Sequence, residues 1–170
     1  MASNHIIKQY QLLTDWYLSV LDGIADQDGS RVINDITNSL EWLGGHLITG
    51  RYRSISRLGV KIAPNKGLDK FVNPAIPPPN AIAFDNKIKY PSLSECRVEW
   101  TSFSTSFHEA LHAVSESVLK TEISFRVPTG GNTVEDALIF VALHEAYHIG
   151  QMSILRKSLG YSPMQLMPKK

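Results

Sequence analysis

Cysteine is nearly absent from this sequence, which holds a single one, Cys96. No internal disulfide can therefore form, and zinc motifs that need several cysteines are excluded. A lone cysteine is typical of a protein from a reducing compartment, and the N-terminal stretch MASNHIIKQYQLL is too polar for a secretory signal. We therefore expect a cytoplasmic protein.

The sequence also has no large excess of charge of either sign. It contains 17 Lys and Arg residues and 16 Asp and Glu residues, which gives a formal charge of +1. Without a basic patch, the chain has no electrostatic footprint for nucleic acid or for an anionic membrane surface. No apolar run approaches the roughly 18–20 residues that a membrane-spanning helix needs. We therefore expect neither nucleic acid nor a membrane as a partner.

The composition that remains is that of a globular protein. The 170 residues are 43% hydrophobic and 19% charged, which predicts one domain over residues 1–170 with a core of its own. Four segments repeat apolar residues at intervals of three and four, the spacing of an amphipathic helix. The pattern predicts an all-α protein, a four-helix bundle. The expected helices cover about residues 4–24, 35–58, 92–119 and 134–159.

Local signals mark the ends of these helices. Asn4 is the expected N-cap of the first, Ser92 with Glu95 has the form of a capping box for the third, and Thr133 with Asp136 caps the fourth. Glycines follow three of the segments as stop signals, namely Gly23, Gly59 and Gly160.

A long connection separates the second and third helices. Residues 61–91 contain six prolines and no sustained periodicity. Connections of about 30 residues without regular structure are uncommon in compact domains and are often functional. The crossover is either a strap between helices that are not neighbours or a wall of a substrate pocket.

Two stretches match the HExxH motif of zinc sites, in which two histidines one helical turn apart can bind the same metal ion. His108 and His112 fall to the side of the apolar stripe of their helix and are expected to be solvated or to face its flank. His144 and His148 instead fall within the apolar arc of the fourth helix. Buried imidazoles need polar partners, so this second pair predicts either a metal site or core histidines bonded to neighbouring side chains.

A zincin protease would need a further acidic or histidine ligand downstream, and no Asp, Glu or His follows His148. A third ligand must come from upstream, where His46 is a better choice than His5 near the N-terminus. Gly44 and Gly45 directly precede His46. They indicate a close approach to the backbone, which either a metal between helices or tight helix packing would require.

These residues carry a resemblance to a known family. The stretch HEAYHIGQMSILRKSLG is similar to the His-x-x-x-His-x-Gly-Gln signature of the DinB-like (DinB/YfiT) superfamily, and NSLEWLGGHLITGRYR resembles its second-helix block. The resemblance implies a four-helix bundle with a long crossover between helices 2 and 3, and an open metal site of His46, His144 and His148. It also implies zinc or nickel as the ion and a homodimer. Gln151 matches the glutamine of the signature, either supporting a ligand or shaping the bundle.

The resemblance further implies a metal-dependent enzyme acting on a small molecule, either a thiol S-transferase with a low-molecular-weight thiol as co-substrate or a hydrolase. A non-catalytic metal-binding protein of stress response or sensing is the alternative, and a zincin protease is less favoured. No general base is evident, because Glu145 points away from the two histidines on a helical wheel, and we assign it no role. Arg51, Arg53 and Tyr147 are candidates for lining the pocket.

Overall fold

The computed structural model describes residues 2–60, 85, 87 and 89–167, and within them the chain forms four long helices. A 3₁₀ turn and one short helix lie in the connections. None of the described helices has a stretch apolar enough to cross a membrane. The elements are α1 (Asn4–Leu21), the 3₁₀ turn (Asp26–Asp28), α2 (Leu40–Arg57), α3 (Leu93–Ala113), α4 (Glu116–Leu119) and α5 (Val134–Ser158).

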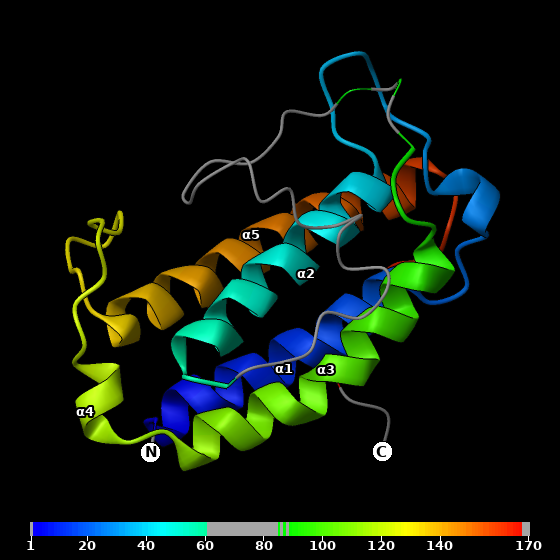
Figure 1. The fold of residues 1–170 in the computed structure, drawn as a ribbon. Helices are drawn as coiled ribbons and strands as arrows, with labels where there is room; N and C mark the ends of the chain where they lie inside the picture. Colours follow the sequence, from blue (N-terminus) through cyan, green and yellow to red (C-terminus); the bar gives the residue numbers. More distant parts are fainter. Residues whose placement is uncertain (1, 61–84, 86, 88, 168–170) are drawn as a thin grey trace.

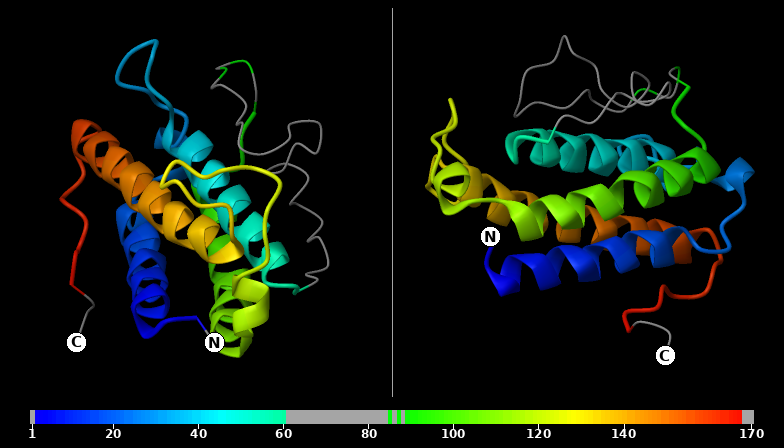
Figure 2. Two further views of the ribbon diagram at one scale, coloured as in Figure 1. Left: turned by 90° about the vertical axis from the view of Figure 1, so that its left-hand side faces the viewer. Right: turned by 60° about the horizontal axis from the view of Figure 1, so that its bottom comes forward.

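The long helices pack as a four-cornered bundle, which confirms the predicted fold class. α5 contacts α1 and α2, and α3 contacts the same two helices from the opposite corner. α1 and α5 run in one direction, whereas α2 and α3 run in the other (Figures 1 and 2). Because α2 and α3 are parallel neighbours, the end of α2 and the start of α3 lie at opposite ends of the bundle. The segment that joins them is the predicted crossover, most of which lies outside the described residues.

The predicted capping signals mostly act as expected. Ser92 and Glu95 form a reciprocal capping box at α3, and Thr133 with Asp136 does the same at α5. At α1 the cap is Ser3, not Asn4, because the Ser3 hydroxyl accepts from the N–H of Ile6. Glycines with positive φ end three helices: Gly23, Gly59 and Gly160.

Two helix boundaries differ from the periodic pattern. α2 begins at Leu40, because Ser39 caps it and the Thr37 hydroxyl accepts backbone N–H groups of the preceding turn. Ile36, expected on the apolar stripe, is 93% exposed. α3 stops at Ala113, since Ser115 starts the separate helix α4 with its own side-chain cap.

Gly44 lies where three helices approach one another. The Tyr17 hydroxyl donates to the Gly44 carbonyl at 3.2 Å, and the Tyr17 ring stacks on Trp100 with centroids 3.8 Å apart. A Cβ added at Gly44 would lie 3.1 Å from both Cys96 Sγ and Tyr17 Oη. Helix packing is therefore what requires this glycine.

We expect Gly44→Ala to destabilise the protein. Overpacking costs about 1–3 kcal/mol, and the higher helix propensity of alanine offsets ~1 kcal/mol of that cost. Gly50→Ala, in the same helix, is the matched control, because a Cβ there meets nothing within 4 Å. That variant should be at least as stable as wild type. Urea unfolding measures both free energies, and equal effects of the two substitutions would contradict the packing argument.

Candidate metal centre

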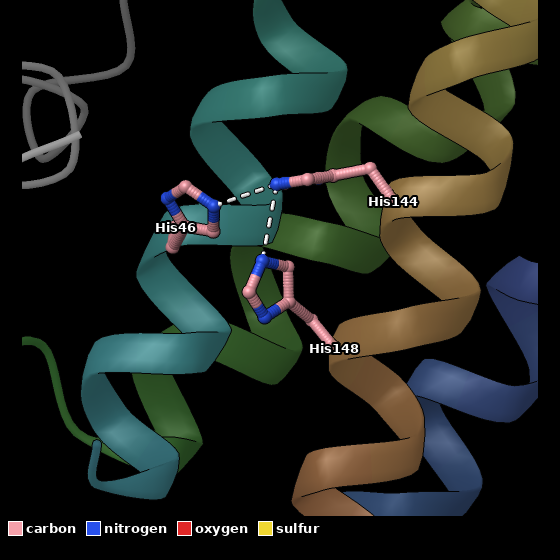
Figure 3. A group of neighbouring side chains, drawn as sticks. All are labelled: His46, His144 and His148. Carbon is pink, nitrogen blue, oxygen red and sulfur yellow. Dashed lines mark hydrogen bonds between the residues drawn. The ribbon is translucent and has the colours of Figure 1, made fainter. Parts of the chain in front are cut away.

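Three histidine side chains from two helices meet between α2 and α5 (Figure 3). His46 projects from α2, and His144 and His148 project from successive turns of α5. The Nε2 atom of His144 lies 3.1 Å from Nε2 of His46 and 3.0 Å from Nε2 of His148. One ligand atom from each residue can be chosen so that all lie within 4.8 Å of one another, and this is the only such His, Cys, Asp or Glu group among the described residues. The structure thus brings together the three residues that the sequence singled out.

Hydrogen bonds alone do not satisfy this cluster. Nδ1 of His148 lies 2.7 Å from Oε1 of Gln151, an acceptor, so the Nδ1 carries the proton and the Nε2 of neutral His148 is a lone pair. His144 Nε2 would then have to donate to His148. The single N–H at His144 Nε2 cannot also donate to His46 Nε2. If His144 Nε2 carried a lone pair instead, it and His148 Nε2 would be two acceptors facing each other.

A divalent cation fits this donor set. Around an ion that binds imidazole nitrogen at ~2.0–2.1 Å, neighbouring ligand nitrogens lie roughly 3.3 Å apart, close to the spacing found here. Three neutral imidazoles would leave the ion its full charge and an open position. Gln151, for which the sequence left two roles open, orients His148 in the manner of residues that support metal ligands.

The three imidazoles are held in their neutral, ligating form. Burial, with the adjacent His144 and His148, lowers the pKa of His46 to about 3. Burial and the neighbouring His148 lower the pKa of His144 to about 4, and burial also lowers the pKa of His148. Protons therefore do not compete for these nitrogens at neutral pH.

Aromatic side chains surround the cluster. Trp42 stacks on the His46 ring, with centroids 4.8 Å apart, and Phe140 lies 6.0 Å from the His144 ring. Tyr147 packs against His148 at 5.0 Å and is itself 64% exposed. The site therefore lies near the surface of the bundle, within an apolar surround.

Glu145, to which the sequence assigned no role, is completely buried and paired with Arg51. The Arg51 guanidinium donates from Nη2 to Oε2 at 2.6 Å and from Nε to Oε1 at 3.1 Å. The same guanidinium lies 3.8 Å from the centroid of the Trp100 ring, and Nη1 donates to Thr14 Oγ1 at 2.6 Å. The pair connects α2 to α5 on the core side, away from the histidines.

Arg51 is therefore a core residue and not the pocket residue that the sequence suggested. A signal was present, because Arg51 stands four residues after Leu47 and four before Ile55, on the buried stripe of α2. Glu145 likewise stands between the buried Ala142 and Ile149 of α5. Charged residues at stripe positions indicate a buried pair, since neither charge is stable there alone.

The remaining candidates take up less central positions. His112 and His5 are exposed, as expected. His108 is half-buried, and its Nε2 lies 3.2 Å from Thr14 Oγ1, so the first HExxH copy lies to the side of the core and contributes nothing to the cluster. Arg53 is half-buried on α2, two turns after His46.

The family model described as the DinB superfamily matches residues 9–152. The chain belongs to the DinB superfamily. No curated protein matches it significantly.

Solved structures of DinB-like proteins share the fold of this chain. A DinB-like protein of Bacillus cereus is 18% identical, with a TM-score of 0.66 over 97% of this chain and 95% of its own. The DinB-like protein YjoA of Bacillus subtilis is 16% identical, with a TM-score of 0.66 over 95% and 96%. YfiT of B. subtilis, described as a probable metal-dependent hydrolase with an unusual four-helix bundle topology, is 16% identical, with a TM-score of 0.61 over 95% and 92%. At these identities the likeness shows the fold alone.

We expect Glu145→Ala to destabilise the protein by about 3–5 kcal/mol, because it leaves the Arg51 charge buried and unpaired. The double variant Arg51→Met with Glu145→Leu should recover most of that loss, since it removes both charges together. Glu109→Ala is the matched control, as Glu109 holds the same place in the other HExxH copy and is exposed. Chemical denaturation measures all three, and a double variant no better than the single one would contradict the charge argument.

The stability of the metal-free protein should fall as the pH decreases from 7 to 5. An imidazole in the unfolded chain takes up a proton near pH 6.5, whereas His46 and His144 stay neutral in the fold down to about pH 3 and about pH 4. The unfolded state then binds more protons than the folded state, so the free energy of unfolding decreases as the pH falls. His46→Gln should flatten this dependence in chelated samples, and His5→Gln, at an exposed position, should not.

Proposed function

We propose that this DinB superfamily protein binds a divalent metal ion through His46, His144 and His148 and acts as a metal-dependent enzyme on a small molecule. The observation that carries the proposal is the meeting of three Nε2 atoms, two pairs of them 3.0 and 3.1 Å apart, from helices that are far apart in the sequence. Zinc and nickel both suit three imidazoles. The description of YfiT as a probable metal-dependent hydrolase supports the same class of activity.

Each residue of the site has a definable part in this proposal. His148 is oriented by Gln151 so that its Nε2 faces the cluster, and Trp42 holds the His46 ring in one plane. The aromatic side chains exclude water from one side and offer an apolar surface to a substrate. An ion bound here would supply Lewis-acid chemistry, by lowering the pKa of a bound water or thiol and polarising a substrate bond.

Thiol S-transfer is the second candidate reaction, and the state of Glu145 favours it. In a zincin the glutamate of HExxH activates the attacking water. Here both carboxylate oxygens of Glu145 are bound to Arg51 in the core, so this residue is not available as a base. A thiol held as thiolate requires no separate base. The same observation argues against a zincin protease.

Metal binding is tested by titrating the purified, chelator-stripped protein with Zn²⁺ and Ni²⁺ in a calorimeter. We expect one ion per chain, and a loss of affinity of at least about 100-fold in His46→Ala or His148→Ala, more than the loss of a supporting residue causes. The double variant His108→Ala with His112→Ala is the matched control, because it removes the other HExxH copy. Equal affinity in the ligand variants and the control would overturn the proposed site.

Activity is tested on two panels of small molecules. One contains chromogenic esters and amides, and the other pairs glutathione, bacillithiol or mycothiol with an electrophile. We expect turnover on one panel that a chelator abolishes, that added metal restores and that His148→Ala lacks. Tight metal binding without turnover on either panel would favour the non-catalytic alternative, a sensor or stress-response protein.

A further inference from the structure

The face of α2 that carries His46 also carries two arginines. His46, Gly50, Arg53 and Arg57 are spaced by four, three and four residues. At about 100° per residue their directions therefore differ by no more than about 60° around the helix. The helix is open between His46 and Arg53, because a Cβ placed on Gly50 meets no atom of the described residues within 4 Å. The candidate metal centre and the two arginines thus lie along one strip of α2.

The charge of Arg53 acts on both of its neighbours in this strip. It lowers the pKa of His46, after the larger effects of burial and of the other two histidines. It also lowers the pKa of Arg57, for which burial is the larger cause. Side chains on a helix lean toward its N-terminus, which for Arg53 is the direction of His46. The positive charge of the strip therefore extends as far as the candidate metal centre.

Arg57 is half-buried and forms no ion pair with any residue in the described part of the chain. Its guanidinium lies 5.5 Å from the centroid of the Phe125 ring, in the loop before α5. In the last turn of α2 its charge also suits the helix dipole, which is a structural reason for one arginine. That reason does not extend to Arg53, because like charges four residues apart on a helix repel each other. Two neighbouring arginines partly withdrawn from water favour a bound anion.

We propose, on the basis of the function proposed above, that Arg53 and Arg57 bind an anionic group of the substrate, while its reactive end lies at the candidate metal centre. The group is a carboxylate or a phosphate, since the fork of donors on a guanidinium fits both. With a rise of 1.5 Å per residue, Arg53 starts ~10 Å along the helix axis from His46 and Arg57 starts ~16 Å from it. The anionic group and the reactive end are therefore separated by several bonds.

Anion binding is tested first on protein stripped of metal and freed of chelator, by an NMR titration with benzoate, phenyl phosphate and benzyl alcohol. The three probes share a phenyl ring, and only the first two carry a charge. We expect at least one charged probe to bind about 10-fold or more tightly than the alcohol, because hydrogen bonds between ionised groups are the stronger ones. The tighter of the two identifies the group. Equal affinity for all three probes would overturn the proposal.

Substitutions locate the anion in the same titration. Arg53→Gln and Arg57→Gln should each weaken binding of the charged probe by about 10-fold, while Arg57→Lys should lose less, because it keeps the charge but not the fork. Arg31→Gln is the matched control, since Arg31 is exposed and paired with Asp28. Urea unfolding shows that each variant is folded. A control that weakens binding as much as the two glutamine variants on α2 would contradict the assignment.

A second titration links the anion to the metal centre. It uses protein loaded with Co²⁺, whose absorption reports a bound thiolate, and two thiols of equal chain length, mercaptohexanoate and mercaptohexanol. We expect the thiolate band at a lower concentration of mercaptohexanoate, and loss of this preference in Arg53→Gln and Arg57→Gln. Equal affinity of the wild type for both thiols would overturn the role of the arginines in substrate binding. Anion binding in the first titration without any Co²⁺ binding would instead overturn the metal-dependent function and leave the anion site in place.

Discussion

The buried pair of Arg51 and Glu145 is the contact on which the arrangement of α2 and α5 depends. Both side chains are fully buried, and two hydrogen bonds join them across the helix interface. Each charge would be unstable in the core without the other, so the two helices must align until the guanidinium and the carboxylate meet. The stacking of Arg51 on Trp100 extends this constraint to α3.

The candidate metal centre lies close to this ion pair, on the same two helices. His46 is little more than one turn before Arg51 on α2, and His144 directly precedes Glu145 on α5. A register set by the ion pair on the core side therefore also sets the separation of the histidines on the outer side. The HExxH motif has a different role here from its role in a protease, because its glutamate is bound to Arg51 in the core while its histidines point toward the cluster between α2 and α5.

Much of this organisation could be predicted because it is local. Periodicity located all four long helices, and the Ser92–Glu95 and Thr133–Asp136 pairs located two of their starts, since a cap involves residues only three apart. Local signals failed where a second local signal competed. Ile36 continues the apolar spacing of α2, but the turn around Thr37 and the cap at Ser39 begin the helix later.

By itself, the sequence determined the helical bundle, the position of His144 and His148 on one side of their helix, and the position of the other HExxH motif to the side of the apolar stripe, because helix faces follow from spacing along one element. The choice of His46 rested on the glycines before it and on the family resemblance. The tertiary structure alone decided which residues from different helices meet. From the sequence, Arg51 could be interpreted as a pocket residue, and Glu145 had no assigned role. The packing of α2 on α5 brings the two side chains together as a buried ion pair. Gln151 and Gly44 each had two possible roles until His148 and Cys96 were seen beside them. Contacts between residues about a hundred positions apart depend on how whole helices pack, and no local pattern in either helix encodes the partner in the other.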